Sequence, residues 1–252
     1  MARIVEFCGV PGVGKSTLYS DLLSKWKKQY NWIPGHKLYP IINIQYKNLP
    51  GFLSSAYARF TKKNDLVAMD NAAKRFIAQN ANFIDCCWGN IYNNQNNNLN
   101  GVDNRFRATE MWLKIITKQQ ILIESPSCKI AVVDEGLIQR IDSTLYKSKC
   151  FEEEKNEIAE VVEKVKLPMG VIYIDADLEV SIARLKARTK KLPILENLSM
   201  PELISLYQNY RTRWRYTFEL LAKKGIPVLT IDSTKEVNQN GKFILKYLEE
   251  LN

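Results

Sequence analysis

The sequence predicts an α/β fold in which helices cover both faces of a parallel β-sheet. Short apolar segments, four or five in number, alternate with amphipathic segments along the chain. A glycine-rich segment joins the first apolar segment to the first helix. At 252 residues, of which 46% are hydrophobic, the chain is long enough to bury a sizeable core.

The amino-terminal part is predicted to contain two strands and one helix. Residues 3–8 are apolar enough for a buried strand, and residues 16–30 place leucines and a tryptophan at helical spacing. A turn that contains proline and glycine is expected at 31–35. We expect the second strand at 36–42, directly after that turn.

A long helical stretch is expected next. Residues 52–63, 65–88 and 104–124 repeat apolar positions every three or four residues, as amphipathic helices do. The asparagine-rich segment 90–101 predicts an exposed loop. Because no linker divides the chain, we expect a single domain over residues 1–252, with residues 48–128 inserted as a helical unit on the acceptor side of the core.

The rest of the chain alternates strands with helices. Strands are expected at 129–134, 170–175 and 226–232, and helices at 151–166, 177–190, 200–223 and 237–251. Because helices separate consecutive strands, we expect the strands to be parallel.

The glycine-rich segment after the first strand fits the pattern G-x-x-x-x-G-K-[ST]. Its sequence is Gly9-Val10-Pro11-Gly12-Val13-Gly14-Lys15-Ser16, and Thr17 follows in the first helical turn. Such a loop turns successive backbone N–H groups towards phosphate oxygens, and the helix amino terminus adds partial positive charge. The segment therefore predicts a phosphate-binding loop.

Four side chains in and beyond this loop have the chemistry for phosphoryl transfer. Lys15 would reach the β- and γ-phosphates, and the Ser16 hydroxyl would bind Mg²⁺. The strand at 129–134 ends in Asp134 and Glu135. We assign Asp134 to the metal ion, since a carboxylate at that place faces it. Glu135 is expected to orient or deprotonate an attacking hydroxyl, and the alternative is a solvated turn residue.

A basic segment, residues 184–195, is a candidate lid. Asp177 is expected to cap its helix, and Arg184 and Arg188 are four residues apart, so we expect them to share one helix face. A basic loop with two lysines follows. These cations would neutralise charge that develops during transfer, and closure would exclude water. A solvated basic helix face is the alternative.

With these segments identified, the chain resembles the nucleoside and nucleotide kinases among the phosphate-loop (P-loop) proteins, especially their thymidylate-kinase-like branch. The similar segments are Gly9–Thr17, Val132–Gly136, Tyr173–Arg188, 210–216 and 225–232. The resemblance implies a three-layer P-loop NTPase core with a five-stranded parallel sheet and a helical insertion. It also implies ATP and Mg²⁺ as cofactors and an acceptor site in the insertion.

Two departures from this group concern the acceptor. Thymidylate kinases carry Asp-Arg at the acidic strand, where the arginine helps to hold the acceptor, but here Glu135 takes the place of the arginine. Deoxynucleoside kinases carry a catalytic Glu-Pro after the second strand, but here the dipeptide is Tyr39-Pro40. The resemblance therefore does not identify the acceptor, and Glu135 becomes the better candidate for the base.

Composition limits the possible partners and compartments. A net charge of +9 favours acidic partners such as polyphosphates, nucleotides or a nucleic-acid backbone. Five cysteines without metal-ligand spacing are typical of free thiols in a reducing compartment, and a single histidine excludes multi-histidine metal sites. No segment approaches the ~20 apolar residues of a membrane span, and the amino terminus lacks a signal-peptide core. We expect a cytoplasmic protein.

The helix at 200–223 carries a stripe of aromatic residues, which is most simply explained as core. Arg211, Arg213 and Arg215 flank this stripe. Arginines beside aromatic residues also bind nucleic acid, so nucleic acid stays a possible acceptor.

The sequence thus predicts an ATP-dependent kinase that transfers the γ-phosphoryl group to a hydroxyl or phosphate of a nucleotide-like acceptor. One alternative is a kinase that acts on nucleic acid, for example on a hydroxymethylated pyrimidine in phage DNA. Another is a nucleotide-dependent ATPase or switch. The expected catalytic residues are Lys15, Asp134, Glu135, Arg184 and Arg188. The acceptor candidates are Arg59, Arg75, Arg105, Arg107 and Glu110.

Overall fold

The centre of the computed structural model is a five-stranded sheet in which every strand is parallel to its neighbours. The structure describes residues 3–39, 69–93, 98–99, 102–103, 105–144, 151–188 and 198–251. The order across the sheet is β2–β5–β1–β6–β7. The strands are β1 (Arg3–Cys8), β2 (Trp32–Pro34), β5 (Ile130–Val133), β6 (Gly170–Asp175) and β7 (Val228–Asp232).

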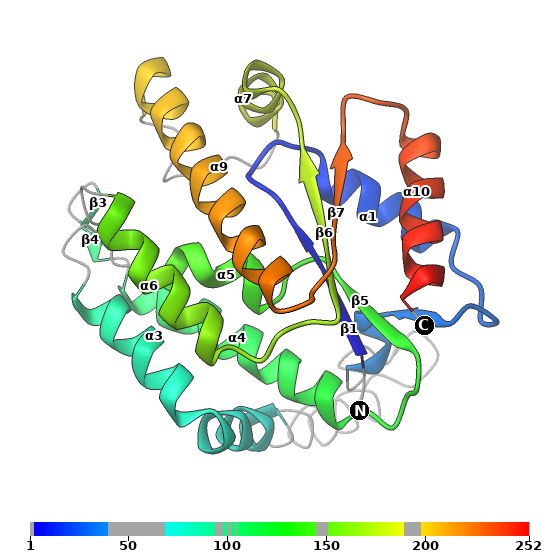
Figure 1. The fold of residues 1–252 in the computed structure, drawn as a ribbon, viewed down its shortest axis with the longest axis horizontal. Coiled ribbons are helices and arrows are strands. Elements are labelled where there is room, and N and C mark those ends of the chain that lie inside the picture. The colour runs from blue at the N-terminus through cyan, green and yellow to red at the C-terminus, as the bar shows by residue number, and fades with distance from the viewer. Residues whose placement is uncertain are drawn as a thin grey trace, which may run out of the picture.

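Helices cover both faces of this sheet. In Figure 1, α1 and α10 lie on one side, whereas α4, α5, α6 and α9 lie on the other. This arrangement confirms the predicted three-layer α/β fold. The helices are α1 (Lys15–Ser24), α3 (Ala81–Asn93), α4 (Arg105–Glu124), α5 (Leu137–Thr144), α6 (Phe151–Lys164), α7 (Leu178–Lys186), α9 (Met200–Lys223) and α10 (Val237–Glu250), and residues 69–79 are also helical.

The central strands are apolar because both of their faces are covered. Val5 and Phe7 on β1, Val132 on β5 and Ile172 on β6 have no exposed surface. β1 pairs with β5 from Arg3 opposite Ile130 to Glu6 opposite Val133, and its other edge pairs with β6. The segments that follow β1 and β5 therefore leave the sheet side by side.

The predicted second strand was wrong in position. The strand is β2, Trp32–Pro34, and residues Gly35–Leu38 form a short 3₁₀ helix where the strand was expected. The tryptophan side chain is buried, and Trp32 pairs with Ile130 of β5. A proline is tolerated in β2 because this strand is at the edge of the sheet, where its missing N–H breaks no ladder.

Other differences concern the helical stretch. The loop expected at 90–101 is shorter, because α3 continues to Asn93 and the short strands β3 (Asn98–Leu99) and β4 (Val102–Asp103) pair antiparallel. The helix α5 was not predicted, although apolar residues recur in it at helical spacing. The helix expected at 52–63 and the lid residues 189–195 lie outside the described residues.

A buried ion pair joins α6 to α9. Arg213 on α9 donates from Nε and Nη2 to the carboxylate of Glu154 on α6, at 2.8 Å and 2.7 Å, and both side chains are buried. Of the helices that the structure describes, none is long and apolar enough to cross a membrane.

Removal of one member of this buried pair should destabilise the fold strongly. In Arg213→Met the Glu154 carboxylate stays buried without its bidentate partner, so the free energy of unfolding should fall by about 3–5 kcal/mol. The double variant Glu154→Leu/Arg213→Met should recover most of this loss. Urea denaturation measures both values. The control is Lys164→Met, which removes a surface pair with Glu160; an effect as large as that of Arg213→Met would contradict the prediction.

Candidate functional site

The predicted phosphate-binding loop leaves β1 and enters α1, as the sequence pattern requires. Its backbone conformation depends on glycine at position 12. Gly12 has φ of +87°, which other residues rarely adopt, and an added Cβ would lie 2.3 Å from the Ser181 carbonyl oxygen of α7. The loop is therefore packed closely against α7.

Three alternate carbonyls of the loop are held by side chains from other elements. The Gly9 carbonyl accepts from Gln139 Nε2 on α5 at 3.3 Å, and the Pro11 carbonyl accepts from the Tyr207 hydroxyl on α9 at 2.5 Å. The Val13 carbonyl accepts from Arg184 Nη1 on α7 at 3.3 Å and from the Ser233 hydroxyl after β7. We call these four donors, Gln139, Tyr207, Arg184 and Ser233, the carbonyl braces. A loop whose carbonyls are turned outward in this way can present its N–H groups to an anion.

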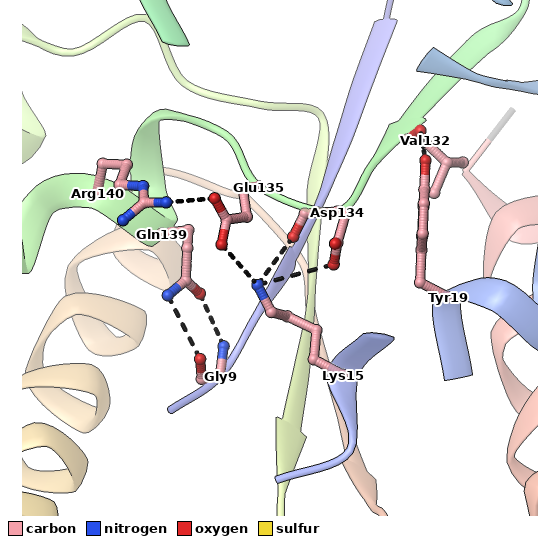
Figure 2. A network of polar contacts seen from close by, with 8 residues as sticks. All are labelled: Gly9, Lys15, Tyr19, Val132, Asp134, Glu135, Gln139 and Arg140. Atoms are coloured by element: carbon pink, nitrogen blue, oxygen red, sulfur yellow. Dashed lines mark hydrogen bonds and ion pairs between the residues drawn. The ribbon is translucent and has the colours of Figure 1, made fainter. Parts of the chain in front are cut away.

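Lys15 connects this loop to the acidic end of β5 (Figure 2). Its Nζ lies 3.1 Å from the Asp134 carbonyl oxygen, 3.5 Å from Glu135 Oε1 and 3.7 Å from Asp134 Oδ1. The structure therefore brings three of the five predicted catalytic residues into contact.

Asp134 has an oxygen that suits a metal ion or a metal-bound water. Its Oδ1 is buried and accepts no hydrogen bond from the part of the chain that the structure describes, and Lys15 Nζ lies 3.7 Å from it. Ser16 lies in the first turn of α1 next to Lys15, with an exposed side chain. A carboxylate and a hydroxyl oxygen are hard ligands of the kind that Mg²⁺ binds. Asp134 and Ser16 thus fit the predicted cofactor chemically.

Glu135 lies between two cations. One carboxylate oxygen faces Lys15, and the other accepts from Arg140 Nη2 of α5. Burial raises the pKa of Glu135, but the charges of Lys15 and Arg140 outweigh burial and hold that pKa below its ordinary value. A carboxylate with a lowered pKa is a weak proton acceptor, so this environment favours orientation of a nucleophile over its deprotonation.

Sequence reasoning missed a role for Glu6, an ionisable residue that is fully buried in β1. Its Oε1 and Oε2 accept from the backbone N–H groups of Leu137 and Ile138 at 3.0 Å and 2.8 Å, at the start of α5. Burial raises the pKa of Glu6 to about 7, although these backbone hydrogen bonds and the charge of Lys15 lower it in part. A charged residue within a short buried strand was the available signal.

The two arginines of the candidate lid have different positions. Arg184 lies in α7 and contacts the loop at Val13 and the turn at Ser233. Arg188 is exposed and follows the end of α7 at Lys186, so the two arginines do not share one helix. Asp177 is at the N-cap position, but its side chain makes no capping hydrogen bond.

The acceptor candidates are dispersed. Arg75 makes a bidentate pair with Glu124, the last residue of α4, which leads into the amino end of β5 rather than its acidic end. The exposed residues Arg105, Arg107 and Glu110 lie in the first turns of α4, where Glu110 pairs with Lys114. Arg59 lies outside the described residues.

Two of the three arginines that flank the aromatic stripe of α9 are paired within the protein. Arg213 forms the buried pair with Glu154, and Arg211 donates to Asp175 and to the Ala176 carbonyl at the end of β6. The aromatic stripe is core, as predicted, with Tyr207 and Trp214 buried. The three arginines thus do not form one free basic surface.

Comparisons with known proteins give no family. No protein-family profile matches the chain, and no curated protein sequence matches it. Among solved structures, the chain is similar to deoxyadenosine kinase from M. mycoides with bound dCTP, at 14% identity and a TM-score of 0.43, over 98% of this chain and 99% of that chain. The same kinase with the products dCMP and a flexible dCDP aligns at 16% identity and a TM-score of 0.42, with the same coverage.

The buried Glu6 should make stability depend on pH. Its pKa in the folded protein is about 7, above the ordinary 4.5, so the folded state binds a proton more readily than the unfolded state. This preference for the protonated form adds to the free energy of unfolding. The added stability is fully present below pH 4.5 and is lost as pH rises through 7. It should amount to up to about 3 kcal/mol.

Urea denaturation between pH 5 and pH 8 measures this effect. The Glu6→Gln variant keeps a hydrogen-bond acceptor but does not titrate, so its stability relative to wild type should increase over this range. A difference between the two proteins that stays constant from pH 5 to pH 8 would contradict the prediction.

Proposed function

We propose that this protein is an ATP-dependent kinase that transfers the γ-phosphoryl group to a hydroxyl or phosphate of a nucleotide-like acceptor. The observation that carries the proposal is the contact of Lys15 with Asp134 and Glu135, at the point where the phosphate-binding loop and the acidic end of β5 meet. One lysine there can serve both the donor phosphates and the acidic residues. The thymidylate-kinase-like branch and the identity of the acceptor stay predictions.

The donor phosphates would bind in the loop between Gly9 and Thr17. The N–H groups at the start of α1 would donate to phosphate oxygens, since a helix has no internal partner for its first N–H groups. The N–H groups of Gly9 and Val13 are already bound inside the protein, to Gln139 and to the Val10 carbonyl. Lys15 would move from the carboxylates to the β- and γ-phosphates. Magnesium would be held by Ser16 and Asp134, and when bound it neutralises charge on the phosphate oxygens.

The acceptor would approach from the side of Glu135. Arg140 stays beside the Glu135 carboxylate and keeps its pKa low, so Glu135 would orient the attacking oxygen as a carboxylate and hold it in line. Arg184 already contacts the loop backbone at Val13, so a small movement would bring its charge to the phosphates. Arg188, in the exposed segment after α7, would complete the charge stabilisation from the lid.

The alternatives differ in what receives the phosphoryl group. Nucleic acid as acceptor has less support, because Arg211 and Arg213 are paired within the protein. An ATPase or switch would transfer to water alone. Incubation with labelled ATP and pools of nucleosides, nucleotides and DNA, followed by mass spectrometry of the products, distinguishes these cases. Label found only in inorganic phosphate would contradict the kinase proposal.

Lys15→Ala should abolish transfer and leave the fold intact. Lys15 contacts carboxylates at the loop rather than the hydrophobic core, so the thermal midpoint should change little. The measurements are turnover with the acceptor identified by the labelling experiment, and thermal unfolding. The exposed Lys223→Ala on α9 is the matched control and should behave as wild type. Near wild-type turnover by folded Lys15→Ala would rule out this ATP site.

Asp134→Asn and Glu135→Gln should have different kinetic effects. Loss of the Asp134 carboxylate should weaken the dependence of ATP binding on Mg²⁺ together with transfer. Loss of the Glu135 charge should lower kcat by roughly 10²-fold while ATP affinity is retained. Titrations with ATP at several Mg²⁺ concentrations and steady-state kinetics measure both. If Glu135→Gln has wild-type kcat, Glu135 is a turn residue only.

A further inference from the structure

Helix α5 is attached to the strand that leads into the phosphate-binding loop. Gln139, in the first turn of α5, uses both ends of its amide on one residue of the loop. Its Oε1 accepts from the Gly9 N–H at 2.8 Å, and its Nε2 donates to the Gly9 carbonyl at 3.3 Å (Figure 2). Only a side chain with both a donor and an acceptor can make this pair of contacts.

The two residues of α5 before Gln139 attach the helix to β1 a second time. Glu6 of β1 accepts from the N–H groups of Leu137 and Ile138, so the start of the helix is fixed to the same strand. The chain passes close to this carboxylate at Gly136, where an added Cβ would lie 2.1 Å from the Glu6 carboxyl carbon. The turn between β5 and α5 is thus held against β1 through Glu6.

These contacts determine the position of the acidic turn. Asp134 and Glu135 follow β5, which pairs with β1, and they precede α5, which Glu6 and Gln139 attach to β1 and Gly9. Arg140, the neighbour of Gln139, holds the Glu135 carboxylate on the side away from Lys15. A displacement of α5 from Gly9 would therefore move Glu135 and Arg140 together, relative to the loop.

We propose that Gln139 is a positioning residue for phosphoryl transfer, which fixes the Glu135–Arg140 pair relative to the phosphate-binding loop through its two hydrogen bonds to Gly9. The proposal rests on the kinase function proposed above. Gln139 acts through Gly9 and α5, so it should affect the transfer step more than the binding of ATP.

Two substitutions of Gln139 and one control test this role. Gln139→Met has a similar length and makes neither bond. Gln139→Glu keeps the acceptor for the Gly9 N–H, but it places a carboxylate oxygen against the Gly9 carbonyl, where Nε2 donated. Gln208→Met, on the exposed surface of α9, is the matched control. We expect kcat to fall about 10- to 100-fold in Gln139→Met, at least as much in Gln139→Glu, and not in Gln208→Met. The KM for ATP should stay within about 3-fold of wild type in Gln139→Met, which adds no charge.

Hydrogen–deuterium exchange gives a readout that does not need an acceptor. In Gln139→Met, backbone amides of 9–14 and of 134–141 should exchange faster together, with an unchanged thermal midpoint and unchanged exchange in α10. Equal kcat in wild type and Gln139→Met, or a loss of kcat and KM that follows the thermal midpoint, would overturn the positioning role.

Failure of the proposed function has a different signature. If wild type binds ATP but transfers phosphoryl to no acceptor, the kinase proposal is wrong, and the exchange data alone decide whether Gln139 couples α5 to the loop. If the amides of 9–14 and 134–141 exchange in Gln139→Met as in wild type, the coupling between α5 and the loop is wrong too. If both segments exchange faster together, that coupling holds, but the role of Gln139 in transfer is overturned.

Discussion

The parallel pairing of β5 with β1 is the contact on which the candidate site depends. Two neighbouring strands that run in the same direction end at the same edge of the sheet, so the loop after β1 and the acidic turn after β5 must emerge together. Lys15 then reaches both Asp134 and Glu135 without any movement of the backbone. With any other strand between β1 and β5, about 4.8 Å of additional separation would break this contact.

A second constraint is that the backbone carbonyl groups of a tightly turned loop need hydrogen-bond donors from outside the loop. Here the carbonyls of Gly9, Pro11 and Val13 are bound by the carbonyl braces, which come from α5, α9, α7 and the turn after β7. Elements that are distant in sequence thus determine the shape of the loop before any ligand binds. Donors that are already oriented need little reorganisation when an anion arrives, which favours both affinity and rate.

The sequence predicted those parts of the site in which local pattern and chemistry coincide. The glycine-rich loop between β1 and α1 and the apolar strand before Asp134 lie where the sequence predicts them, because each combines a characteristic segment with polar residues at its end. The position of β2 could not be predicted in this way, since Trp32–Pro34 contains proline and lies within residues 31–35, where a turn was expected. Pairing with β5 makes this segment a strand.

Contacts between distant segments were the hardest part to predict. Gln139 looks ordinary in the sequence, and Glu6 is marked only as an ionisable residue in an apolar strand. Their roles arise because α5 folds back on β1 and Gly9. In the sequence, Arg213 resembles a surface cation, but in the structure it is buried and paired with Glu154 of α6. Arg75 was expected near the acceptor, but its partner Glu124 places it at the other end of β5. Periodicity predicts which face of a helix is buried, but it does not predict which charged residue of the neighbouring element that face will contact.

A crystal structure with Mg²⁺ and a non-hydrolysable ATP analogue tests the central claim most directly. The account predicts phosphates in the loop between Gly9 and Thr17, with Lys15 Nζ moved from Asp134 and Glu135 to the phosphate oxygens. It also predicts that the hydrogen bonds of Gln139, Tyr207 and Ser233 to Gly9, Pro11 and Val13 persist, because the loop is already in its binding shape. An analogue bound elsewhere, or a loop that has to turn these carbonyls inward, would contradict it.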